Sequence, residues 1–175
     1  MHISLQKQVI TGFRSVRKKI ILDYTKLPTG LYFIEGWNEE APRLGSNGAG
    51  KSTVFSESFK WLLTGAISES QRPGVHVKNR LSDKSEVSSN FEFDGVVHEL
   101  GRFRHPNNLT IDGSKVEQSE IDALFPLSDE AMSRSIFISQ FADLFLSMKP
   151  EEKSRLFSET LDLDKWIVAA DKAGK

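Results

Sequence analysis

The chain has 175 residues, close to the usual size of one globular domain, and 38% of them are hydrophobic. Its 23 basic and 24 acidic side chains give a net charge of −1, so any contact with nucleic acid must come from a local patch. The absence of cysteine excludes disulfides, thiolate zinc sites and thiol nucleophiles, and fits a reducing compartment. No apolar run approaches the roughly 20 residues of a membrane span, and none has signal-peptide character, so a soluble cytoplasmic protein is expected.

The first third of the chain predicts three strands. Residues 3–9 alternate polar and apolar side chains, and an apolar run at 20–22 lies in the second strand. The run Leu31-Tyr32-Phe33-Ile34 follows the turn residues Pro28-Thr29-Gly30 and is unbroken, which is typical of a strand buried on both faces. The next residues, 36–44, are interpreted as an inserted surface segment before a glycine-rich loop.

A helix and an antiparallel meander are predicted in the middle of the chain. Apolar side chains recur at helical spacing over 51–63, and Gly65 is a plausible stop. After the irregular residues 66–84, two apolar runs flank Asp94-Gly95, a strong hairpin signal. Further turns, which extend the hairpin into a meander, are predicted at 106–108 and 112–113.

The last third is predicted to be mostly helical. Short helices are expected at 119–125 and 128–135, and a short strand at 136–138. Another helix is expected over 150–161, because proline suits a first helical position and the acidic residues after it complement the positive end of a helix.

The glycine-rich loop carries the chemistry. Residues 45–52, Gly-Ser-Asn-Gly-Ala-Gly-Lys-Ser, match G-x-x-x-x-G-K-[ST], in which glycines let several backbone N–H groups point at phosphate oxygens. We predict that Lys51 reaches the terminal phosphates and that the Ser52 hydroxyl contacts Mg²⁺. Nothing in the sequence resembles the guanine-selective N-K-x-D element, so ATP with Mg²⁺ is the expected ligand.

With Thr53 included, the loop resembles the G-x-N-G-x-G-K-S-[ST] variant of chromosome-maintenance and break-repair ATPases. These are SMC proteins, RecF and RecN relatives, and especially the SbcC-type partner of the Mre-type nuclease. The resemblance implies an α/β P-loop NTPase fold, the N-terminal lobe of an ABC-type ATPase head, with an antiparallel β-meander flanking the phosphate-loop helix. It implies that the nucleotide contacts Asn47, Gly48, Ala49, Gly50, Lys51, Ser52 and Thr53.

Two further short elements are similar to the same family. Residues 11–15, Thr-Gly-Phe-Arg-Ser, resemble its N-F-[RK]-S element, with Gly12 in place of asparagine, and imply that Arg14 approaches the phosphates. The string Phe-Ile-Ser-Gln at 137–140 implies that Gln140 contacts Mg²⁺ and the attacking water and acts with Lys51 in catalysis. From the residues alone, a surface arginine and a solvated glutamine remain alternatives.

Two longer elements also resemble the family. Residues 149–157 with Leu161-Asp162-Leu163 are similar to its proline-acid-basic helix, which implies that 150–175 lead towards a coiled coil; an ordinary amphipathic helix is the alternative. Arg102 and Arg104 lie at alternate strand positions and share a face. They line either a phosphate or DNA surface or a solvated face.

Other family elements are missing from residues 1–175. There is no S-G-G motif and no apolar strand that ends in Asp-Glu. The resemblance therefore implies a single N-terminal lobe whose C-terminal lobe is absent, with a homodimer of heads, a nuclease subunit and DNA as partners. ATP hydrolysis is then expected from the complete head, and almost none from this chain alone.

Three alternatives stay open at this point. A small nucleotide kinase shares the phosphate loop, but its lid usually carries several arginines, and only Arg72 and Arg80 lie in the corresponding stretch. The element around Arg14 argues against a transporter ATPase. The third is an ATP-gated scaffold that tethers DNA without a nuclease. A bacterial protein, or a viral one in a bacterial host, is expected.

Overall fold

The computed structural model describes residues 3–39, 41–67, 77–125, 132, 136, 147–161, 163 and 166. The chain divides into two compact units, Met1–Ile121 and Asp122–Lys175. Within the described ranges, no helix is long and apolar enough to cross a membrane. Gln140 lies outside the described residues, as do most of the predicted helix at 128–135 and strand at 136–138.

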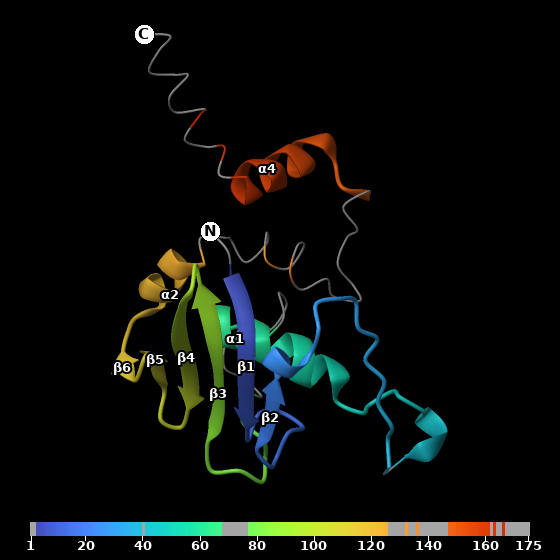
Figure 1. Ribbon diagram of the computed structural model, residues 1–175. Helices are drawn as coiled ribbons and strands as arrows, with labels where there is room; N and C mark the ends of the chain where they lie inside the picture. The colour runs from blue at the N-terminus through green and yellow to red at the C-terminus, as the bar shows by residue number, and fades with distance from the viewer. Residues whose placement is uncertain are drawn as a thin grey trace. The chain divides into compact units, whose positions relative to one another are not determined.

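The first unit is built on a six-stranded antiparallel sheet in the order β2-β1-β3-β4-β5-β6 (Figure 1). The sheet confirms the first two predicted strands, the hairpin at Asp94-Gly95 and the meander after it. Both residues of that turn have positive φ, 47° and 91°, which matches the twist of the flanking strands. The strands are β1 (Ile3–Thr11), β2 (Ile20–Asp23), β3 (Ser85–Phe93), β4 (Val96–Arg104), β5 (Asn108–Ile111) and β6 (Ser114–Lys115).

The predicted helix at 51–63 is confirmed, with one difference. The chain is helical from residue 51, widens into a π-helix over Thr53–Glu57 and continues as α1 (Ser58–Thr64), which lies on one face of the sheet (Figure 1). Gly65 ends the helix with φ of 76°. The aromatic rings of α1 pack against the sheet and against the turn after β1: the ring centroids of Phe59 and Phe91 lie 5.5 Å apart, and those of Trp61 and Phe13 lie 5.4 Å apart.

A buried chain of polar groups joins this helix to the sheet. The Gln8 amide, on β1, is buried and donates to Ser58 Oγ at 3.0 Å, and Ser58 Oγ donates to the Val54 carbonyl at 2.7 Å. Gln8 Oε1 accepts from the Tyr24 hydroxyl at 3.1 Å. Burial raises the pKa of the Tyr24 phenol, so it remains a donor at neutral pH. Because the buried amide has a partner for its nitrogen and its oxygen, it fixes the helix without an unsatisfied group.

Two of the later predicted helices are also confirmed. The first is α2 (Gln118–Leu124). The other is α4 (Pro150–Thr160), in the second unit, which begins at the expected proline. The Glu152 carboxylate accepts from the Lys149 backbone N–H at 3.3 Å, so an acidic side chain satisfies a backbone donor at the positive end of α4.

The predicted buried strand at Leu31–Ile34 is wrong for the described chain. These residues belong to no strand, and Leu31 and Phe33 have relative exposures of 102% and 92%. A strand buried on both faces needs neighbours in a sheet, and the six described strands pair only with one another. The apolar run therefore has the composition of a buried strand without the neighbours that would bury it.

The side chain of Arg102 lines neither a phosphate or DNA surface nor a solvated face, the two roles considered for it from the sequence. Its guanidinium donates to the Leu62 carbonyl at 2.9 Å and the Leu63 carbonyl at 3.3 Å, and it also bonds the Gln118 side chain. These carbonyls lie in the last turn of α1, where helical partners are missing and a cation is favoured. Arg102 thus connects β4 to the end of α1, and to α2 through Gln118.

We expect the substitution Arg102→Met to lower the free energy of unfolding by about 2 kcal/mol, because hydrogen bonds from a charged donor to the end of α1 are lost. Urea denaturation followed by circular dichroism measures the change. Arg104→Met, two residues along the same strand, is the matched control and is expected to change stability by less than about 0.5 kcal/mol. Equal losses in the two variants would contradict the assigned role of Arg102.

Candidate functional site: the phosphate loop

The loop folds as its glycines predict. Gly45, Gly48 and Gly50 have φ of 57°, 73° and 83°, a region that other residues rarely adopt. The Val54 N–H donates to the Gly50 carbonyl at 3.0 Å, so the first helical turn starts directly at the loop. The backbone N–H groups of this first turn have no helical partners, and the helix presents them, with its positive end, to the loop.

Lys51 points back into the loop. Its Nζ donates to the Ser46 carbonyl at 2.6 Å, so the ammonium group lies over the turn that the glycines form. A phosphate oxygen could replace this carbonyl as acceptor and would form the stronger, charge-assisted bond. The geometry therefore places a cation, a curled backbone and a helix N-terminus together.

Ser52 and Thr53 differ in the availability of their hydroxyl groups. The Ser52 side chain is exposed, and no hydrogen bond to it is present in the described part of the chain. Thr53 Oγ1 donates to Glu57 Oε2 at 2.9 Å along the helix. The Ser52 hydroxyl is therefore accessible, whereas the Thr53 hydroxyl is engaged, and the role of Ser52 as a Mg²⁺ ligand stays a prediction. No group of three or more acidic or histidine side chains that could hold a metal occurs among the described residues.

The inserted segment at 36–44 lies directly against the loop. Asn38 donates from its backbone to the Gly45 carbonyl at 3.2 Å and from its side chain to the Asn47 carbonyl at 3.0 Å. A Cβ atom added to Gly36 would lie 2.8 Å from Ala49 Cβ and 3.3 Å from Lys51 Cγ. The segment also contains a 3₁₀ turn over Pro42–Leu44. It therefore braces the loop.

The turn after β1 also lies beside the loop, because a Cβ atom added to Gly50 would lie 3.7 Å from Ser15 Oγ. Gly12 has φ of 62°, and a Cβ atom there would lie 2.0 Å from the Lys84 carbonyl oxygen, so this position requires glycine. Two residues on, Arg14 also has positive φ, 48°. Its N–H donates to the Val77 carbonyl at 2.7 Å, and its carbonyl accepts from the Asn79 amide at 2.5 Å. These bonds hold a conformation that an arginine rarely adopts.

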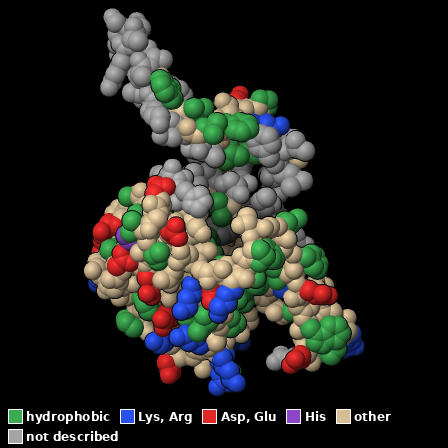
Figure 2. Space-filling view, viewed as in Figure 1, with side chains coloured by type: hydrophobic (Ala, Val, Ile, Leu, Met, Phe, Trp, Pro, Cys, Tyr) green, Lys and Arg blue, Asp and Glu red, His purple; other side chains and the backbone are tan. Residues whose placement is uncertain are grey.

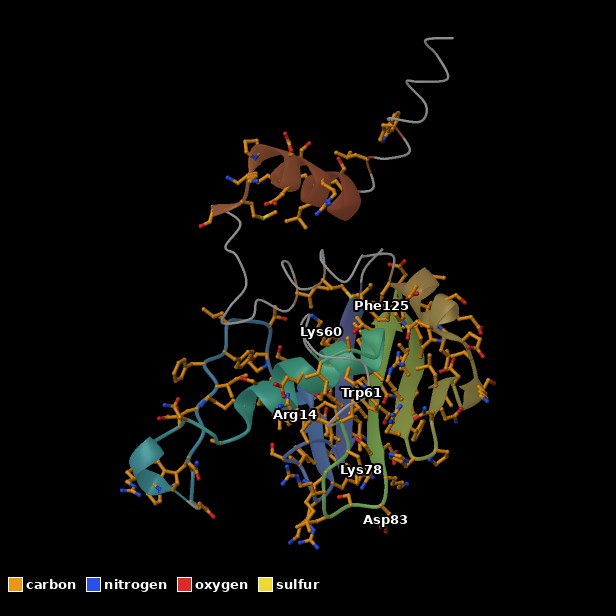
Figure 3. All side chains as sticks on the ribbon, turned by 180° about the vertical axis from the view of Figure 1, so that it is seen from behind. Arg14, Lys60, Trp61, Lys78, Asp83 and Phe125 are labelled. Atoms are coloured by element: carbon orange, nitrogen blue, oxygen red, sulfur yellow. The ribbon has the colours of Figure 1, made fainter. Side chains whose placement is uncertain are left out.

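Arg14 contacts the helix that follows the loop. Its guanidinium forms an ion pair with Glu57 at 2.5 Å, and Figure 3 shows it beside that helix. Since the other Glu57 oxygen accepts from Thr53, an ion pair and a hydrogen bond connect Arg14 to the end of the phosphate-loop motif. Approach of Arg14 to phosphates stays a prediction. It requires the Arg14 guanidinium either to leave Glu57 for a phosphate or to contact both at once.

The structure thus brings together the predicted residues from 45 to 53 and places Arg14 beside their helix, while Gln140 lies outside the described residues. Sequence reasoning missed Gly36, Asn38 and Glu57. The spacing of Thr53 and Glu57, four residues apart on one helix face, was a usable signal for that contact. Nothing in the sequence pairs Asn38 with the loop.

No protein-family model matches the chain, and neither does any curated protein. Among solved structures, the chain is similar to the recombination mediator protein RecF with ATP, at 19% identity and a TM-score of 0.48 over 68% of this chain and 30% of RecF. It is also similar to the SMC head domain from Thermotoga maritima, at 19% identity and a TM-score of 0.43 over 69% of this chain and 41% of that domain. The chain thus spans less than half the length of these structures.

We expect Asn38→Ala to loosen the phosphate loop, since the side-chain bonds to the Asn47 carbonyl and from the Ala41 N–H are lost. Amide hydrogen exchange at residues 45–50, followed by mass spectrometry, should accelerate about fivefold, the equivalent of about 1 kcal/mol. Asn107→Ala, in the exposed turn between β4 and β5, is the control and should leave these residues unchanged. Unaltered exchange in Asn38→Ala would show that the segment does not brace the loop.

Proposed function

We propose that this chain is the N-terminal, ATP-binding lobe of an SMC-like ATPase head. The observation that carries the proposal is the arrangement of Lys51 over the glycine turn at the start of a helix, with Ser52 exposed beside it. When nucleotide is bound, Mg²⁺ would screen phosphate charge, and the Ser52 hydroxyl would be its ligand from this chain. The backbone N–H groups and Lys51 would hold the phosphates, and Arg14 would supply a further cation.

The exposed run Leu31–Ile34 supports the proposal of a second, C-terminal lobe. This run pairs with none of the described strands, so its backbone can pair with another strand, and its large exposed apolar side chains favour burial. We propose that strands of the second lobe flank this run and complete the sheet around the phosphate loop. In the complete head, that lobe and Gln140 would supply the water-activating groups, and two heads would dimerise around ATP.

A basic surface supports DNA as a partner. Arg17 and Lys18 are exposed in the turn between β1 and β2, and with Lys84 they line a shallow hollow that also contains Asp83. Lys19 and Arg80 are exposed in the same turn and in the segment before β3. Figure 2 shows Lys and Arg side chains gathered at the lower end of the first unit. Local positive charge of this kind binds phosphate backbones despite the net charge of −1.

Within this proposal, the head controls DNA processing by a nuclease partner in double-strand-break repair or recombination. ATP would drive dimerisation of two heads because its phosphates contact both, and hydrolysis would release them. The assignment of this role rests on the order of the phosphate loop, the Arg14 element and the 149–163 segment along the chain.

The first test is calorimetric binding of ATP and GTP with Mg²⁺, together with phosphate release, by the wild-type chain and by Lys51→Ala. We expect weak ATP binding that is lost in Lys51→Ala, because the ammonium group over the loop is removed, and almost no turnover in either protein. Lys26→Ala, an exposed lysine paired with Asp23, is the control and should bind like the wild type. Turnover comparable to that of a complete ATPase would refute the need for a second lobe and favour a small nucleotide kinase.

DNA binding has a separate test. Replacing both Arg17 and Lys18 with alanine should weaken binding to a labelled duplex in fluorescence anisotropy, and should reduce the slope of log affinity against log salt by about two. The pair Lys26→Ala with Lys115→Ala removes the same charge elsewhere on the first unit. If that control variant reduced the slope equally, binding would depend on overall charge and not on this surface.

A further inference from the structure

Trp37 is held at the phosphate loop but keeps its ring in solvent. Its relative exposure is 69%, although tryptophan is usually largely buried. No hydrogen bond or ring contact joins it to another residue of the described chain. By contrast, Trp61 is 3% exposed and packs against Phe13. A large apolar ring that remains exposed on a backbone held against the loop is a feature that folding of this unit does not explain.

The position of Trp37 is fixed from both sides. Gly36 lies so close to the loop that a side chain there would collide with Ala49 and approach Lys51. Asn38 is hydrogen-bonded to the carbonyls of Gly45 and Asn47. The backbone of Trp37 therefore lies within one residue of contacts to both halves of the loop, and its side chain is exposed to solvent from that position.

A nucleotide bound at this loop leaves its base outside the loop. The curled backbone and Lys51 can hold phosphates only, so the base must find a surface near the edge of the loop. Purine bases have flat faces that stack on aromatic rings, and this contact is tolerant of the identity of the base. Tyr32 and Phe33 are also exposed, but among the described residues no hydrogen bond or ring contact joins them to the loop, and the Tyr32 hydroxyl donates to the Pro28 carbonyl.

We propose that the inserted segment at 36–44 forms the base site, with the Trp37 ring stacked on the purine of the bound nucleotide. The inference rests on the proposed function, because it requires nucleotide phosphates at the loop. It assigns the insertion a second role besides bracing: the same backbone contacts that brace the loop would hold the ring in place. Since stacking does not read base edges, ATP and GTP depend on Trp37 alike.

The test compares ATP, GTP and inorganic tripolyphosphate, which has the phosphates without a base, by calorimetry with Mg²⁺. Trp37→Ala should bind ATP and GTP about tenfold more weakly and tripolyphosphate as the wild type does. Trp37→Phe, which keeps an aromatic face, should retain most of the nucleotide affinity. Phe33→Ala and Trp166→Ala remove comparably exposed aromatic rings and should bind ATP normally.

Each outcome has a distinct meaning. Equal weakening of ATP and tripolyphosphate in Trp37→Ala would show that the ring only supports the loop, and unchanged ATP binding would show that the ring contacts something else, such as a partner protein. Either result overturns the inference and leaves the proposed function standing. A wild-type chain that binds neither ATP nor tripolyphosphate overturns both. As an independent measurement, ATP but not tripolyphosphate should quench the tryptophan fluorescence of the wild type, and this quenching should be absent in Trp37→Phe.

Discussion

The hydrogen bond between Gln8 and Ser58 determines where the phosphate loop can lie. It joins the middle of β1 to the helix that leaves the loop, in the core, where water cannot replace it. A buried amide that loses its partner costs more than the bond itself contributes, so this contact resists sliding or rotation of the helix. The loop therefore projects from a helix whose position the sheet has already fixed.

Three separate stretches of chain then meet around the start of that helix. The 36–44 segment bonds the loop through Asn38, and the turn after β1 pairs Arg14 with Glu57. The same turn is held by Val77 and Asn79, which lead into β3. Most of these contacts involve a backbone group, and the Arg14–Glu57 ion pair adds a link between side chains, so the site is built on connected elements before any ligand arrives.

The sequence predicts features that depend on local chemistry. Turn residues such as Asp94-Gly95 place the hairpin, and glycines place the loop, because backbone conformation there depends on a few neighbouring residues. Contacts between distant segments were not predictable: no local pattern links Asn38 to the loop or Arg102 to the carbonyls of α1. The predicted strand at Leu31–Ile34 was wrong for a different reason. A composition suited to a buried strand cannot show whether the neighbouring strands are present.

The π-helix over Thr53–Glu57 determines how the side chains at the start of the helix, at residues 51–52, are oriented around its axis relative to those of α1. Its wider turn inserts one residue between the loop and the anchored α1, as the bond from the Ser58 N–H to the Thr53 carbonyl shows. Consecutive residues of an α-helix differ by about 100° around its axis. Deletion of one residue from this turn would leave both ends helical. It would also rotate Lys51 and Ser52 by about a quarter-turn around the helix axis relative to α1.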